Sequence, residues 1–165
     1  MASEAAAPQT LITPALRDSL NVWGEPRVTP PVDRGDIRRW AIAVYWPDVP
    51  PKLFWDEEYA KTTRWGGIIA PREFNPFAWP AVRPADMAPK PLIRKPGERS
   101  MNGGQKETYG VPIRVGDVIT AKTALVSMEE KVGSLGLTLF KYTEIRWTNQ
   151  KNEFVRSRVS ISIVY

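Results

Sequence analysis

The sequence contains no cysteine and no histidine among its 165 residues. Without cysteine the chain forms no disulfide and offers no thiolate to a metal. Without histidine only oxygen ligands remain, which disfavours zinc. Nucleophilic catalysis by serine–histidine or cysteine–histidine pairs is excluded for the same reason. We therefore expect no metal site and no resident cofactor, and the lack of cysteine fits a cytoplasmic protein.

Long apolar runs are also missing. No stretch approaches the ~20 residues that cross a bilayer, and residues 1–14 lack the basic start and apolar centre of a secretory signal. We expect residues 1–14 to form a flexible arm, residues 15–165 to form one domain, and no membrane association. The net charge of +5 fits an ordinary solvated surface, and it also fits an anionic partner such as a small ligand or an acidic carrier protein. Blocks of lysine and arginine are missing, so nucleic acid is not an expected partner.

The first half of the chain predicts short helices. One is expected over Leu16–Trp23. Asp33 has the character of an N-cap for a second helix, whose apolar positions recur with helical spacing up to Val44. A third is expected over Asp56–Thr63, where acidic residues suit the positive helix start.

The last third predicts strands. Strand-like segments are expected over residues 105–113, 118–131, 135–148 and 153–165, separated by turns such as Gly133-Ser134. Helices followed by antiparallel strands indicate an α+β protein. Between the halves, residues 70–96 carry seven prolines, which interrupt any helix there. Residues 94–104 are polar and are expected to form a mobile loop.

Three ordered segments carry a family resemblance: VDRGDIRRWAIAVY, FWDEEYAKTTRWGGIIAP, and the strand-rich tail from GGQKETYGVPIRVGDVITAKTALV to the end of the chain. Together they cover most of residues 32–165. They resemble the MaoC-like hydratases and dehydratases, and in particular the N-terminal, FAS1-like dehydratase domain. The resemblance implies a single hot-dog fold, a curled antiparallel sheet around a central helix that is here shortened and proline-interrupted.

The resemblance also implies reversible addition of water to an α,β-unsaturated acyl thioester, with coenzyme A entering only as part of the substrate. In the family an Asp and a His move the protons, because imidazole titrates near neutrality. Here Asp48 matches the position of the family's Asp only loosely. The alternative interpretation is that Asp48 is an ordinary turn residue. Phe54 occupies the histidine position, and a phenyl ring moves no proton. No residue of this chain is therefore expected to be catalytic.

The remaining candidate residues are assigned to binding. Gly66 and Gly67 either let a ligand approach the backbone or simply follow a helix end. Aromatic residues are expected to form an acyl-pocket wall or core: Phe54, Trp55, Phe74, Phe77 and Trp79. Basic residues are expected to meet coenzyme A phosphates or an acidic carrier: Arg64, Arg72, Lys90, Arg94 and Lys95.

A chain without its own base predicts a separate partner. Hot-dog domains work in pairs, and this sequence ends after the last expected strand. We expect a catalytic MaoC-like subunit on another polypeptide, in a heterodimer or a dimer of heterodimers. The shortened helix favours a bulky acyl group, as in the similar heteromeric hydratases of steroid side-chain catabolism. A subunit of a carrier-protein dehydratase in fatty or mycolic acid synthesis and a non-enzymatic acyl-thioester-binding protein remain alternatives.

Overall fold

The computed structural model describes residues 10–78, 99–134 and 136–165. Its first half holds the short helices α1 (Pro14–Asp18), α2 (Arg34–Tyr45) and α3 (Glu57–Thr62), the 3-10 turn η1 (Lys52–Phe54) and the two-residue strand β1 (Arg27–Val28). The long strands follow: β2 (Ser100–Tyr109), β3 (Thr120–Gly133), β4 (Gly136–Thr148) and β5 (Phe154–Val164).

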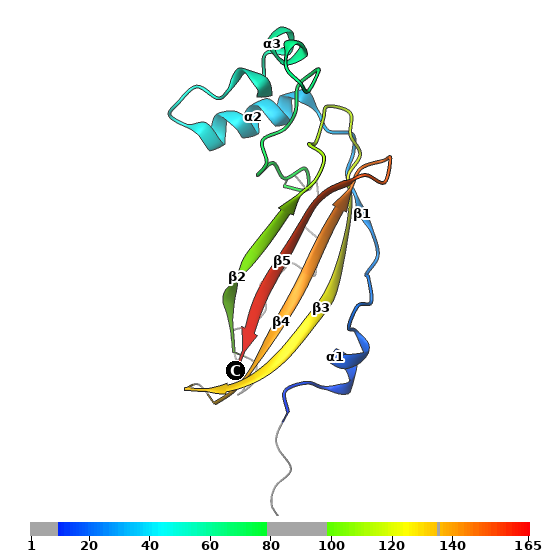
Figure 1. The fold of residues 1–165 in the computed structure, drawn as a ribbon, viewed down its shortest axis with the longest axis vertical. Helices are drawn as coiled ribbons and strands as arrows, with labels where there is room; N and C mark the ends of the chain where they lie inside the picture. Colours follow the sequence, from blue (N-terminus) through cyan, green and yellow to red (C-terminus); the bar gives the residue numbers. More distant parts are fainter. Residues whose placement is uncertain (1–9, 79–98, 135) are drawn as a thin grey trace, which may run out of the picture.

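The five strands form one antiparallel sheet in the order β1-β3-β4-β5-β2. The helices α2 and α3 stand at one end of this sheet, while α1 lies beside β3 nearer the other end (Figure 1). The α+β class expected from the sequence is therefore confirmed. Among the described residues, every helix precedes the long strands in the sequence and none follows them.

Local capping explains where the helices begin. The Asp33 carboxylate accepts a hydrogen bond from the Gly35 N–H at 2.7 Å, and Asp56 accepts one from the Tyr59 N–H at 3.0 Å. The predicted N-cap Asp33 and the predicted helix start at Asp56 are thus confirmed. The first helix is shorter than the predicted Leu16–Trp23, because residues 20–24 run along β3 instead. There, the Asn21 N–H donates to the Leu125 carbonyl at 2.7 Å.

A loop was expected over residues 94–104, but the structure has strand β2 from Ser100 onward. From Ser100 onward this stretch is paired with β5, with Ser100 opposite Val164. The glycines of this stretch indicated a loop, because glycine in a polar stretch usually marks a turn. At Gly103, however, an added Cβ would lie only 2.8 Å from an Ile161 methyl, so glycine is what lets the two strands lie close together.

The hydrophobic core sits under α2, at the end of the sheet. Ile37 from α2, Phe74 and Ile119 are the largest fully buried side chains, and Trp147 of β4 belongs to the same cluster. Residues 71–78 form turns, as in the hydrogen bond from the Phe74 N–H to the Pro71 carbonyl. The rest of the predicted central helix, residues 79–96, lies outside the described residues, so that helix stays a prediction.

Candidate functional site

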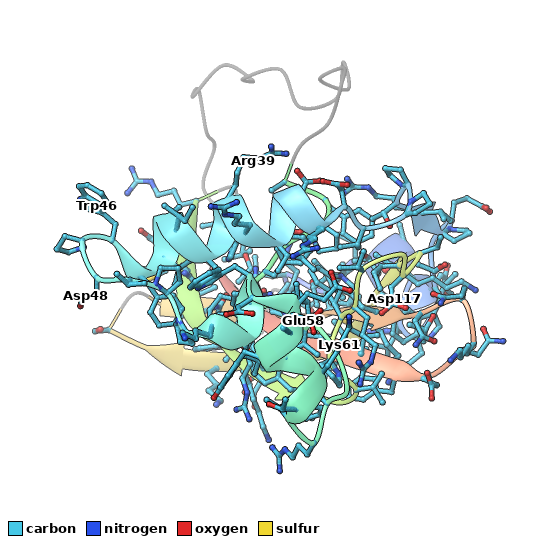
Figure 2. All side chains as sticks on the ribbon, turned by 90° about the horizontal axis from the view of Figure 1, so that it is seen from above. Arg39, Trp46, Asp48, Glu58, Lys61 and Asp117 are labelled. Carbon is cyan, nitrogen blue, oxygen red and sulfur yellow. The ribbon has the colours of Figure 1, made fainter. Side chains whose placement is uncertain are left out.

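The two positions of the expected proton-transfer pair have different surroundings. Asp48 is exposed in the turn after α2, where its N–H donates to the Tyr45 carbonyl at 2.8 Å. Figure 2 shows Asp48 and Trp46 beyond the end of α2, at the outer edge of the molecule. Phe54 packs against the core, with its ring 5.9 Å from that of Tyr45. This arrangement contains no acid–base pair.

The candidates Trp55, Gly66 and Gly67 lie in the helical part of the fold, Trp55 directly after η1 and the glycines after α3. The Trp55 indole N–H donates to the Pro50 carbonyl at 2.9 Å, which holds the half-buried ring on the η1 turn. Gly66 has φ 65°, a left-handed conformation that glycine adopts without strain. Both glycines line a shallow hollow beside Glu57 and Lys61 of α3. Their binding role stays a prediction.

The other aromatic candidates belong to the core region where the structure describes them. Phe74 is 1% exposed and meets Trp40 edge-on at 5.7 Å between ring centroids. Phe77 is half-buried, 5.4 Å from the Trp147 ring. Their packing is that of core residues, and their place in an acyl-pocket wall stays a prediction. Trp79, Lys90, Arg94 and Lys95 lie outside the described residues.

The basic candidates Arg64 and Arg72 come together at one pocket of about 170 Å³. One wall is formed by residues 69–71, where the Ala70 N–H donates to the Ile113 carbonyl at 2.8 Å. The other is the end of β2 with residues 110–113, anchored by the hydrogen bond from the Gly110 N–H to the Val155 carbonyl. Trp65, Tyr109 and Arg156 complete the polar and aromatic lining.

A hydrogen-bonded network that the sequence did not predict forms the floor of this pocket. Arg156 of β5 is 5% exposed and donates to the Arg72 carbonyl at 3.3 Å and to a Glu107 carboxylate oxygen at 3.1 Å. Arg158 donates to the same oxygen at 2.6 Å, and the Tyr109 hydroxyl donates to the other. One signal was present in the sequence: Arg156 and Arg158, two positions apart on a predicted strand, share one face of the sheet.

This network fixes the protonation states at the pocket. Burial acts to raise the pKa of Glu107, but the hydrogen bonds from Tyr109 and Arg158 and the Arg156 charge outweigh it and lower that pKa. The hydrogen bond to Glu107, together with burial, raises the pKa of Tyr109. At neutral pH the carboxylate is therefore ionised and the phenol protonated, so neither group titrates near pH ~7 as an acid–base catalyst does.

The described part of the chain holds no group of three or more acidic side chains placed to bind a metal ion. It also holds no helix with the length and apolar character needed to span a membrane.

The fold is that of solved hydratases and dehydratases of the hot-dog type. It is similar to the ChsH1–ChsH2 complex from Mycobacterium tuberculosis, with TM-score 0.66 and 18% identity over 87% of this chain and 84% of that one. It is also similar to the HadBC (3R-hydroxyacyl-ACP dehydratase) complex from the same organism, with TM-score 0.55 and 18% identity over 86% and 93% of the two chains. These likenesses define the class as an α+β, hot-dog-like dehydratase fold.

The family follows from the sequence profile of the FAS1-like, dehydratase domain region, which matches residues 22–158. The chain belongs to this family. Among curated proteins, it is similar to a UPF0336 protein of Thermobifida fusca, 29% identical over 108 residues that make up 66% of this chain and 68% of that protein. The family resemblance expected from the three sequence segments is therefore confirmed.

Proposed function

We propose that this chain is the non-catalytic subunit of a heteromeric hydro-lyase that adds water to enoyl thioesters or removes it from 3-hydroxyacyl thioesters. One observation carries the proposal: within a dehydratase domain, the proton-transfer positions hold an exposed turn residue, Asp48, and a core-packed phenyl ring, Phe54. A partner hot-dog subunit with Asp and His supplies the acid and base. This chain supplies part of the binding surface.

The size of the pocket supports a shared site. Pockets that enclose a drug-sized ligand measure roughly 300–1,000 Å³, and the pocket beside β2 measures about 170 Å³. It holds a fragment of an acyl thioester and leaves the acyl chain outside. We propose that the acyl chain lies between this chain and the partner, and that the aromatic candidates favour a bulky, steroid-like acyl group.

The edge of the sheet offers the partner a place to dock. Strand β2 is the last strand of the sheet, and between Met101 and Tyr109 no described strand pairs with its outer side. An exposed edge of this length is a ready template for a strand of another chain. Tyr109 ends β2 at the pocket, so a partner docked along β2 would reach the pocket as well.

The test is co-expression with candidate MaoC-like subunits that carry Asp and His, followed by a water-addition assay. The chain alone should be inactive on short and steroidal enoyl-CoA, and the complex should be active, with the steroidal substrate preferred. The Asp48→Asn variant of this chain should leave the activity of the complex within about twofold, because the carboxylate faces solvent.

Other outcomes point elsewhere. Full activity of the chain alone would overturn the non-catalytic role. Activity of the complex on hydroxyacyl carrier protein but not on enoyl-CoA would favour the second candidate, a carrier-protein dehydratase, which the likeness to HadBC supports. Acyl-thioester binding with no activity beside any partner would leave a non-enzymatic binding protein.

A further inference from the structure

The two edges of the sheet differ in what lies beside them. Between Met101 and Tyr109 the outer side of β2 has no strand of the described chain next to it. The outer side of β3 is lined by residues 10–29, which include α1 and β1 and run in the opposite direction to β3 (Figure 1). We call residues 10–29 the cover. The sheet is therefore open at one edge and covered at the other.

The cover bonds to main-chain groups of β3. The Gly24 N–H donates to the Thr123 carbonyl at 2.9 Å, and the Asn21 N–H donates to the Leu125 carbonyl at 2.7 Å. Carbonyls two positions apart point to the same side of a strand, so both of these lie on the outer edge of β3. A strand from another chain would need the same carbonyls in order to pair there.

Beyond Leu125 the cover is held by one side chain. A bulge interrupts the pairing of β3 between Leu125 and Ser127. Further along, the Glu130 carboxylate accepts hydrogen bonds from the Leu11 N–H at 2.5 Å and from the Thr10 hydroxyl at 3.0 Å. The helix α1, which lies between these contacts and Leu125, has no buried residue. This part of the cover therefore shields the edge and adds nothing to the core.

The cover is itself a poor template for a further strand. Its strand portion, β1, is two residues long. Pro26 directly precedes β1 and has no N–H to donate. A very short strand flanked by proline is one of the ways in which natural sheets block pairing at an edge. The cover thus hides the β3 edge without creating a new one.

Covering one edge limits how copies of the chain can join. The β2 and β3 edges are different surfaces, so copies joined β2 to β3 would add head to tail without closing. We propose that the cover prevents this addition by closing the β3 edge against strand docking. The sheet then accepts a partner strand only at β2, from one further chain. The inference goes beyond the proposed function, since it holds for any partner that docks on β2.

Two deletions test the cover by sedimentation velocity of the isolated chain. Deleting residues 1–19 removes α1 and the contacts to Glu130 but keeps the hydrogen bonds of Asn21 and Gly24. Deleting residues 1–26 removes those bonds too and keeps β1. The full chain should form nothing larger than a dimer. The longer deletion should at least double its mean mass over an about tenfold rise in concentration, and the shorter deletion should lie between the two.

The matched control is Asp33→Ala, which weakens α2 but leaves the cover in place. It should sediment like the full chain. A synthetic peptide of residues 10–26 should reverse the self-association of the longer deletion, because it can occupy the β3 edge. In the associated sample the β2 amides should be protected from hydrogen exchange, because β2 of the next copy is the strand that docks.

Several results would overturn the inference. One is growth of the full chain beyond a dimer, and another is an unchanged mass in deletions shown to be folded by circular dichroism. Self-association of Asp33→Ala equal to that of the deletions, or self-association that the peptide does not reverse, would also count against it, because general destabilisation produces both. If the longer deletion is unfolded, the shorter one decides, since none of its described residues is buried.

Discussion

At the residue scale, Glu107 holds the pocket floor together. It accepts hydrogen bonds from Tyr109, Arg156 and Arg158. Within the part of the chain that the structure describes, it is also the residue that forms an ion pair with the buried Arg156. Removing one partner of a buried pair costs more than the pair contributes, because the remaining charge is left without compensation. The stability of this end of the sheet should therefore depend on the charge of one carboxylate.

The Glu107→Gln variant tests this dependence through pH. The pKa of Glu107 is lowered below its ordinary value of 4.5 in the folded chain, so its stabilisation is present above that value and is lost as pH falls through the folded pKa. At neutral pH the variant should be less stable by about 2 kcal/mol. The difference from the unaltered chain should shrink toward pH ~3, as measured by urea unfolding.

The matched control for this variant is Glu58→Gln. Glu58 pairs with Lys61 on α3, but its side chain is 87% exposed, so its loss should leave stability nearly unchanged at both pH values. A difference between Glu107→Gln and the unaltered chain that grew on acidification would contradict the assignment of the network.

At the element scale, α2 depends on the N-cap residue that precedes it. Asp33 caps the helix, and the helix covers the core with Ile37 and Ala41. The Asp33→Ala variant should lower the free energy of unfolding by about 1 kcal/mol, because an N–H at the helix start loses its acceptor. Asp48→Ala, which removes an exposed carboxylate beyond the other end of α2, should cost much less in the same denaturant titration. Equal losses would show that α2 is not stabilised by its cap.

The elements were largely predictable because their signals are local. A cap such as Asp33 acts within one helical turn, and hairpin turns such as Gly133-Ser134 lie between alternating segments. The start of β2 was missed, because the role of Gly103 depends on Ile161 and Ile163 of another strand. The pocket floor was missed for the same reason, since Arg156 and Glu107 meet across 49 positions of sequence. Such contacts depend on the register between β2 and β5, which no hairpin turn fixes because the two strands are far apart in the sequence.

At the scale of the whole molecule, the core lies at one end of the sheet and an open edge runs along β2. Hydrogen exchange should reveal this asymmetry. In the isolated chain the β2 amides should exchange faster than those of β4, which is paired on both sides. Addition of the catalytic partner should slow exchange in β2, as followed by mass spectrometry of peptides.

The exposed hairpin end around Lys131 provides the internal comparison for this experiment, since it should stay fast with and without partner. Protection at β1, the other edge of the sheet, with β2 unchanged would show that the partner docks on the opposite side.

The position of Arg156 has a consequence for how this protein can diverge. Its side chain is both the floor of the pocket and a buried part of the sheet, between Trp147 and Tyr109 and bonded to Glu107. Under the proposed function, substitutions at the rim, at Arg64 or Arg72, would alter ligand preference while the fold is kept. Substitutions at the floor would disturb the sheet as well as the pocket, so under the proposed function a change of ligand preference that keeps the fold would have to be made at the rim.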